Sequence, residues 1–257
     1  MVEHIRAKKY LGQNFLTDPK IAQLMVESVD VSNGDQIIEI GSGTGALTQS
    51  LASVCNTQNA HLTAVEFDID LIPILKSKII ENANVKIVNA NILNLLDDFK
   101  ISENTHLKII GSLPYNITSP LIHKLIKIKP RPETCVFLIQ KEVAQKICEQ
   151  APDSSYLSVF VQTFYKTEIL KIVDKNLFSP IPKVEGAVIK LTRKPTDELI
   201  PDISRYEKFL HHIFSHPRKM LNKVFTKEKL EEYQLDSTKR AQNYNSDVYS
   251  QIFSEKM

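Results

Sequence analysis

The stretch QIIEIGSGTGALT, residues 36–48, joins a short β-branched run to three closely spaced glycines. The whole chain has only seven glycines, and three of them, Gly41, Gly43 and Gly45, lie here. Glycines between a strand and a helix let the backbone approach a ligand closely and leave the free N–H groups of the helix facing it. Ligands of open α/β sheets bind at the carboxyl ends of the strands. The stretch therefore predicts a strand, a ligand-binding turn and a helix.

Apolar runs typical of buried strands alternate with helical patterns through the first half of the chain. The runs are QIIEIG, LTAVE, VKIVN, LKIIGS and TCVFLIQ, and the helical segments are ALTQSLASV, LIPILKSKII and SPLIHKLIKI. This alternation predicts an α/β fold with a mostly parallel, Rossmann-like sheet and helices on both faces. Two later runs, EILKIV and GAVIKLTR, are expected to form an antiparallel hairpin at the sheet edge. Upstream, DPKIAQLMVESV begins with an N-cap residue followed by proline, which predicts a helix start.

The composition bounds the domain organisation. A length of 257 residues, 42% of them hydrophobic, suits a globular protein with one large core and a small second domain. The polar, proline-containing stretch KPTDELIPD is interpreted as a linker, which gives a first domain over residues 1–195 and a small α-helical domain over residues 196–257. No apolar run approaches the ~20 residues that cross a bilayer, and the N-terminus lacks the apolar core of a secretory signal. We therefore expect a cytoplasmic protein with no membrane contact.

Three polar residues at predicted strand ends indicate the cofactor. Glu39 precedes the glycine turn, where a carboxylate repels a pyrophosphate and attracts a cation. S-adenosylmethionine (SAM) carries a sulfonium and an amino group but no phosphate, so it suits this turn better than a dinucleotide does. Glu66 is placed to accept bonds from ribose hydroxyls, a role that nicotinamide enzymes share, and Asn91 to bond the adenine edge. Together these residues favour SAM.

The motif GSLPYNIT, residues 111–118, ends the fourth predicted strand. The exocyclic amine of a nucleobase is a poor nucleophile, and two acceptors could hold its protons and direct its lone pair at a methyl group. The side chain of Ser112 and the carbonyl of Leu113 are candidates for these acceptors, and Tyr115 offers a face on which the base stacks. The alternative is a proline turn with Tyr115 in the core, and this motif alone favours that alternative.

Basic residues form two clusters although the formal net charge is only +2. Such clusters suit an anionic polymer such as RNA, and for any one cluster a solvated helix face is an equally good interpretation. The residues expected to contact RNA are Lys124, Lys127, Arg218, Lys219 and Lys223. The cysteines and histidines are dispersed, so no metal site is predicted.

Six motifs occur in the order found in the ribosomal RNA adenine dimethyltransferases: GQNFLTD, EIGSGTGALT, VEFD, SLPYNIT, IQKEVAQKI and FSPIPKVEGAV. The segments FSHPRKMLNK and KRAQNY resemble the helical domain of the small-subunit branch of that family. The resemblance covers nearly the whole chain. It implies that residues 1–195 form a SAM-dependent methyltransferase domain and that the helical domain contacts RNA.

The resemblance also implies an activity, a partner and further site residues. The implied reaction is dimethylation of the exocyclic amines of two adjacent adenosines in the hairpin loop near the 3′ end of 16S ribosomal RNA, by a monomer acting on the small ribosomal subunit. Gln13, Asn14 and Leu16 would help to close the SAM site, and Phe178 would contact the target base opposite Tyr115. On the same pattern, Gly41 and its neighbours would hold the methionine part of SAM.

Two positions depart from the family pattern, which has Asn at position 112 and Asp at position 91. Asn91 keeps a carbonyl acceptor, so modestly weaker cofactor binding is expected. Ser112 has a shorter reach than Asn, so we expect lower but not abolished activity. Three alternatives remain at this point: a large-subunit ribosomal RNA dimethylase, a catalytically weakened assembly factor that binds ribosomal RNA, and a DNA adenine methylase.

Overall fold

The computed structural model describes residues 7–98, 105–114, 116–195 and 200–256. The chain divides into two compact units, one comprising residues 1–141 and 168–192 and the other residues 142–167 and 193–257. The domain boundary expected after residue 195 lies close to residue 193, where the chain enters the second unit for the last time. The sequence analysis did not assign residues 142–167 to the second unit.

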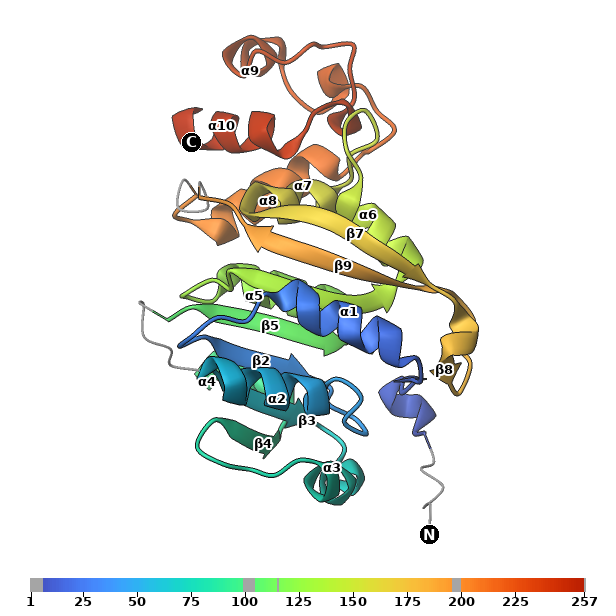
Figure 1. The fold of residues 1–257 in the computed structure, drawn as a ribbon. Coiled ribbons are helices and arrows are strands. Elements are labelled where there is room, and N and C mark those ends of the chain that lie inside the picture. Colours follow the sequence, from blue (N-terminus) through green and yellow to red (C-terminus); the bar gives the residue numbers. More distant parts are fainter. Residues whose placement is uncertain (1–6, 99–104, 115, 196–199, 257) are drawn as a thin grey trace. The chain divides into compact units, whose positions relative to one another are not determined.

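A seven-stranded sheet forms the centre of the first unit, with the strand order β4-β3-β2-β5-β6-β9-β7 (Figure 1). The strands are β2 (Gln36–Ile40), β3 (His61–Glu66), β4 (Val85–Asn89), β5 (Leu107–Ser112), β6 (Thr134–Gln140), β7 (Tyr165–Val173) and β9 (Gly186–Arg193). Neighbours from β4 to β6 pair in parallel, and β9 pairs antiparallel with β6. This arrangement confirms the predicted fold class, including every predicted strand.

The strand order reverses direction between β2 and β5, which places a crevice at their carboxyl ends. In the parallel register Ile40 lies opposite Gly111 on one side and Val65 on the other. A Cβ atom at Gly111 would lie 2.5 Å from the carbonyl oxygen of Ile40. Glycine is therefore needed here so that β5 can approach β2 and deliver Ser112 to the crevice.

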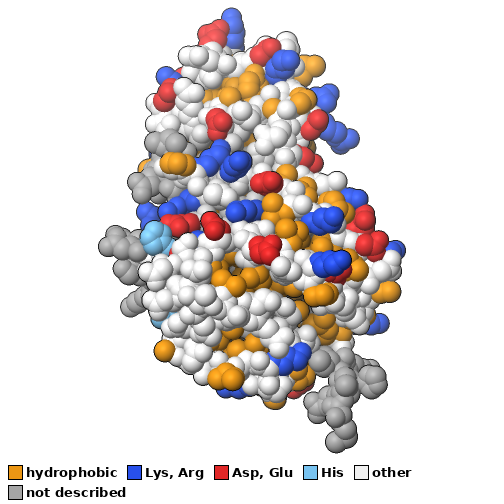
Figure 2. Space-filling view, in the orientation of Figure 1, with side chains coloured by type: hydrophobic (Ala, Val, Ile, Leu, Met, Phe, Trp, Pro, Cys, Tyr) orange, Lys and Arg blue, Asp and Glu red, His pale blue; other side chains and the backbone are white. Residues whose placement is uncertain are grey.

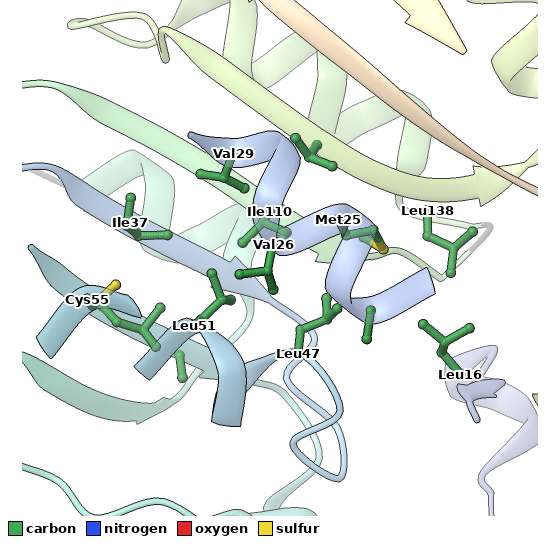
Figure 3. Packing of buried hydrophobic residues seen from close by; sticks show 14 of the residues in the cluster. Leu16, Met25, Val26, Val29, Ile37, Leu47, Leu51, Cys55, Ile110 and Leu138 are labelled. Carbon is green, nitrogen blue, oxygen red and sulfur yellow. The ribbon is translucent and has the colours of Figure 1, made fainter. Parts of the chain in front are cut away.

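Helices of the first unit pack on the sheet through apolar faces. They are α1 (Pro19–Val29), α2 (Thr48–Gln58), α3 (Ile72–Lys78), α4 (Ile92–Asp98) and α5 (Thr118–Lys127). Figure 3 shows Met25 and Val26 of α1 beside Ile110 of β5, within one buried apolar cluster. The predicted start of α1 is confirmed, because the Asp18 carboxylate accepts hydrogen bonds from the N–H groups of Lys20 and Ile21.

The segment before α1 is hydrogen-bonded to a part of the chain that is distant in sequence. Strand β1 (Phe15–Leu16) pairs antiparallel with β8 (Phe178–Ser179), and the N–H of Thr17 donates to the carbonyl of Leu177 at 2.9 Å. A short 3-10 helix, η1 (Lys9–Leu11), precedes β1. These contacts bring residues 9–17 to the same edge of the sheet as the glycine turn, because the ring of Phe15 lies 3.4 Å from a Cβ built on Gly43.

The second unit is predominantly helical and has an aromatic core. Its helices include α7 (Tyr156–Phe164), α8 (Ile203–Phe214), α9 (Lys227–Glu232) and α10 (Ser246–Lys256), together with most of α6 (Lys141–Cys148). Tyr206 of α8 lies in this core, with its ring centroid 5.1 Å from that of Phe253 and its hydroxyl 2.8 Å from that of Thr163.

Within the described ranges, no helix is long and apolar enough to cross a membrane. The His, Cys, Asp and Glu side chains of those ranges form no group of three that could hold a metal ion.

Candidate active site

A cavity of about 260 Å³ lies at the carboxyl ends of β2, β3 and β5. Segments far apart in the sequence meet there, including residues 11–16 and the glycine turn. Nearly all of the predicted site residues line it: Gln13, Asn14, Leu16, Glu39, Gly41, Gly43, Glu66, Asn91, Ser112, Leu113 and Phe178. Tyr115 lies outside the described residues, and Gly45 is not part of the cavity wall.

The glycine turn uses backbone conformations that other residues rarely adopt. Gly41, Gly43 and Gly45 have φ values of 70°, 55° and 88°, in the left-handed region. The turn is fastened to β3, because the N–H groups of Gly41 and Ser42 both donate to the carbonyl of Val65. Gly45 faces Leu75 instead of the cavity, so its role in this structure is to form the turn.

Glu66 connects the glycine turn to the end of β3. The residue is 7% exposed, and its carboxylate accepts hydrogen bonds from the N–H groups of Gly43 and Asp68, each at 2.7 Å. Burial raises the pKa of Glu66, and these bonds oppose that rise. Each carboxylate oxygen has a second acceptor site, so the group can also accept bonds from ribose hydroxyls.

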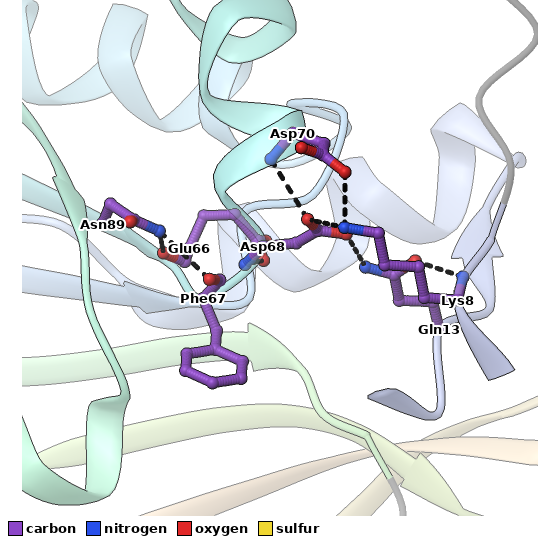
Figure 4. A network of polar contacts seen from close by, with 7 residues as sticks. All are labelled: Lys8, Gln13, Glu66, Phe67, Asp68, Asp70 and Asn89. Atoms are coloured by element: carbon purple, nitrogen blue, oxygen red, sulfur yellow. Dashed lines mark hydrogen bonds and ion pairs between the residues drawn. The ribbon is translucent and has the colours of Figure 1, made fainter. Parts of the chain in front are cut away.

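A polar network extends from this point to the N-terminal segment (Figure 4). Lys8 donates from Nζ to Asp68 at 2.5 Å and to Asp70 at 2.6 Å, and Gln13 donates from Nε2 to Asp68 at 2.8 Å. Burial alone would raise the pKa of Asp68, but the bonds from Lys8 and Gln13 outweigh it and lower that pKa. Lys8 and Asp68 were not identified from the sequence, although Asp68 lies within the VEFD motif.

Phe67 is a third residue of this region that was not identified from the sequence. Its side chain is 57% exposed, lines the cavity, and points away from the polar network in Figure 4. An exposed aromatic ring directly after Glu66 provides a flat surface on which a nucleobase could stack. The feature of the sequence that could have identified Phe67 is a large apolar residue between two acids at the end of a predicted strand.

Asn91 lies at the cavity with one acceptor already engaged. Its Oδ1 accepts a hydrogen bond from the N–H of Leu93 at 2.9 Å. An amide oxygen has two lone pairs, so one acceptor site and both amide hydrogens remain for an adenine edge. The substitution of Asn for the family's Asp therefore retains some hydrogen-bonding capacity.

The motif at the end of β5 forms another part of the cavity wall. The N–H of Leu113 donates to the carbonyl of Leu138 at 2.9 Å, which continues the pairing of β5 with β6 past Ser112. The carbonyl of Pro114 accepts the N–H of Ile117 at 3.2 Å. Asn116, which was not predicted, also lines the cavity and adds an amide to this wall.

Phe178 reaches the cavity from β8. It is 6% exposed, and a Cβ built on Gly186 would lie 3.1 Å from its ring. The bare backbone of Gly186 thus makes room for the ring, and both residues line the cavity.

The predicted RNA-contacting residues lie elsewhere. Lys124 pairs with Asp97 at 2.6 Å, whereas Lys127 is exposed, and neither belongs to the cavity wall. Arg218, Lys219 and Lys223 are exposed residues of the second unit. On the face drawn in Figure 2, basic and acidic side chains are interspersed, so charge alone does not mark an RNA surface there.

Glu39 shows how the cavity suits a cationic ligand. It is 1% exposed, and its Oε1 accepts a bond from Thr48 Oγ1 at 3.0 Å, while its buried Oε2 has no hydrogen-bond partner. Burial raises its pKa to about 7, and the charge of Glu66 contributes in the same direction. Since a buried acceptor without a partner is costly, an ammonium group at this wall would be stabilising. The residues present therefore fit SAM.

A Rossmann-like sheet with a glycine turn after β2 and acids at the ends of β2 and β3 defines a nucleoside-binding methyltransferase of the SAM-dependent class. Residues 4–256 match the model of the ribosomal RNA adenine dimethylase family. The chain therefore belongs to that family, and its cofactor is SAM, as the sequence motifs predicted.

Curated relatives agree with this assignment. The chain is 34% identical over 252 residues to ribosomal RNA small subunit methyltransferase A of a Sulfurihydrogenibium species, covering 97% of this chain and 96% of the relative. It is 37% identical over 221 residues to the protein of the same name from Thermotoga maritima, covering 84% and 74%.

Two solved structures show the same fold. A dimethyladenosine transferase from Plasmodium falciparum superposes with a TM-score of 0.77 at 23% identity, covering 91% of this chain and 94% of that one. The 23S rRNA methyltransferase ErmE superposes with a TM-score of 0.73 at 24% identity, covering 93% and 98%.

The raised pKa of Glu39 predicts a pH dependence of cofactor binding. With a pKa of about 7, Glu39 is mostly protonated near pH 6 and must release its proton to pair with an ammonium group. The affinity for SAM should therefore rise about eightfold from about pH 6 to about pH 7.5. The same raised pKa affects the stability of the protein without ligand. Because the folded state holds the proton of Glu39 more tightly than the unfolded state does, the free energy of unfolding falls as the pH rises through about 7.

Isothermal titration with SAM across this range measures the effect. In Glu39→Gln, which keeps the bond from Thr48, affinity should be weaker and its pH dependence flatter. Equal affinity of the parent protein at both pH values would contradict the role of Glu39.

Proposed function

We propose that the protein transfers methyl groups from SAM to the exocyclic amines of two adjacent adenosines in the hairpin loop near the 3′ end of 16S ribosomal RNA. It would act as a cytoplasmic monomer on the small ribosomal subunit during its biogenesis. One observation carries the proposal: the acids Glu39 and Glu66 share one cavity with the acceptor groups at Ser112 and Leu113. The curated relatives named for the small subunit support this choice of RNA.

The cavity suggests how each residue contributes. Bound SAM supplies an electrophilic methyl group on a positively charged sulfur. Glu39 would hold its amino group, and Glu66 its ribose, with the glycine turn against the methionine part. Gln13, Asn14 and Leu16 would close the cofactor side from the N-terminal segment, and Phe67 and Asn91 would contact the adenine.

The target base would lie against the wall formed by the end of β5. There the Ser112 hydroxyl and the Leu113 carbonyl would accept the two amine hydrogens and orient the nitrogen lone pair. Phe178 and Tyr115 would hold the ring between them. Positioning of this kind is the main contribution that the protein can make, because orientation of two reactants lowers the barrier substantially.

RNA contacts outside the cavity are proposed for the exposed residues Lys127, Arg218, Lys219 and Lys223. Lys124 is a weaker candidate than the sequence suggested, because its ammonium group already pairs with Asp97. Phosphate contacts release counterions, so binding to the subunit should weaken strongly with added salt.

The direct test supplies labelled SAM and small subunits that lack the modification. The expected result is dimethyladenosine mapped to the 3′ hairpin loop, with no label in large subunits or in subunits that are already dimethylated. SAM binding measured in parallel distinguishes the second candidate, a catalytically weakened assembly factor, which the short side chain of Ser112 favours. Subunit and cofactor binding without methyl transfer would support that candidate and overturn the enzyme proposal.

Substitution of Ser112 tests how the amine is positioned. Ser112→Asn restores a longer acceptor and should raise the methylation rate several-fold, whereas Ser112→Ala should lower it by about fivefold, the equivalent of one hydrogen bond of about 1 kcal/mol. Single-turnover rates with saturating SAM provide the measurement. A Ser112→Asn variant no faster than the parent would contradict the proposed role of Ser112.

A further inference from the structure

The second unit contains a groove that the proposed reaction does not use. One wall is a face of α8 that carries Arg205, Lys208, Phe209 and His212. The last three follow Arg205 by three, four and seven residues, so all four lie on the same face of the helix. The opposite wall comes from the segment around α9, including Phe225 and Tyr233. All of the residues that line the groove belong to the second unit.

Aromatic rings form the floor of this groove. The centroid of Tyr233 lies 6.3 Å from that of Phe209 and 5.6 Å from that of Phe225, and both pairs are edge-to-face. Phe209 and Tyr233 are buried, but Phe225 is only half-buried, so part of its ring is open to the groove. His212 meets Phe225 at 5.6 Å.

Cationic residues also line the groove. Arg205 and Lys208 are exposed, and in the part of the chain that the structure describes neither side chain forms an ion pair. Lys229 lies 5.2 Å from the centroid of Tyr233 and pairs with Glu232 at 2.9 Å, so its charge is partly compensated. No acidic residue belongs to the groove wall among the described residues.

We propose that this groove binds an unpaired RNA base, with Arg205 and Lys208 contacting the phosphates on either side of it. An aromatic floor favours a flat ring, and uncompensated cations at the edge favour an anionic backbone; together these are the features of single-stranded nucleic-acid sites. The inference rests on the proposed RNA substrate, and it adds a base-binding site that is separate from the methyl-transfer cavity. An acidic peptide would match the cations but would not need the aromatic floor.

Photocrosslinking of the full chain tests the proposal. The probe is single-stranded octauridine RNA that carries 5-iodouridine, and the adduct is located by mass spectrometry. The expected adduct is on Phe225 or Tyr233. Adducts confined to the methyl-transfer cavity or to other surfaces would overturn the proposal. Two competitors are added in turn, an octaglutamate peptide and unlabelled octauridine. If the peptide removes the groove adduct and octauridine does not, the proposal is overturned in favour of an acidic peptide.

Three variants separate base contact from charge and from folding. Phe225→Leu keeps an apolar side chain but removes the ring, and it should weaken octauridine binding about fivefold. The melting temperature, measured in parallel, reports the separate loss of ring contacts with Tyr233 and His212. Arg205→Gln combined with Lys208→Gln should lower the salt slope of binding by about 1.4. The control is Lys227→Gln, which changes an exposed cation of α9 outside the groove and should leave the adduct intact.

Methylation of small subunits is measured on the same samples. A groove adduct without methylation would refute the proposed reaction and leave this inference standing. Methylation by the parent protein with no groove adduct, and with unchanged octauridine binding in Phe225→Leu, would refute this inference alone.

Discussion

The carboxylate of Glu66 accepts hydrogen bonds from two backbone N–H groups, and the wall of the cavity around the glycine turn depends on that arrangement. One comes from Gly43 in the glycine turn and the other from Asp68 just beyond β3. The side chain of Asp68 then accepts bonds from Lys8 and Gln13 of the N-terminal segment. Three segments that are distant in sequence are thus joined by a continuous series of short hydrogen bonds. A buried carboxylate is costly unless it is well bonded, so this series also makes the burial of Glu66 tolerable.

The two acids of the cavity are held in opposite ways. Both oxygens of Glu66 are bonded to the protein, whereas Glu39 keeps one buried oxygen without a partner. A carboxylate held by one backbone hydrogen bond at each oxygen is a fixed acceptor with capacity left for hydroxyl groups. A carboxylate with one buried oxygen unbonded is a site that a cation would stabilise. This difference is consistent with the proposal that Glu39 and Glu66, on the neighbouring strands β2 and β3, contact different parts of the cofactor.

The elements that depend on local pattern were predictable from the sequence. The strands, the glycine turn and the capped start of α1 follow from β-branched runs, scarce glycines and the Asp18–Pro19 pair. The contact between Lys8 and Asp68 joins residues 60 positions apart, and no local pattern reports such a pairing. The assignment of residues 142–167 to the second unit was missed for the same reason. Alternating glycines look alike in sequence, and only the fold shows that Gly41 and Gly43 line the cavity whereas Gly45 does not.

We expect the N-terminal segment to complete the cofactor site through Asp68. Titration of S-adenosylhomocysteine into Lys8→Met, Asp68→Asn and the double variant measures this effect, with the exposed neighbour Lys9→Met as control. Each single variant should weaken binding roughly tenfold, and the double variant should be little worse than Asp68→Asn, because the two residues act through one contact. Single variants that bind as tightly as the parent, or effects that simply add, would contradict the account.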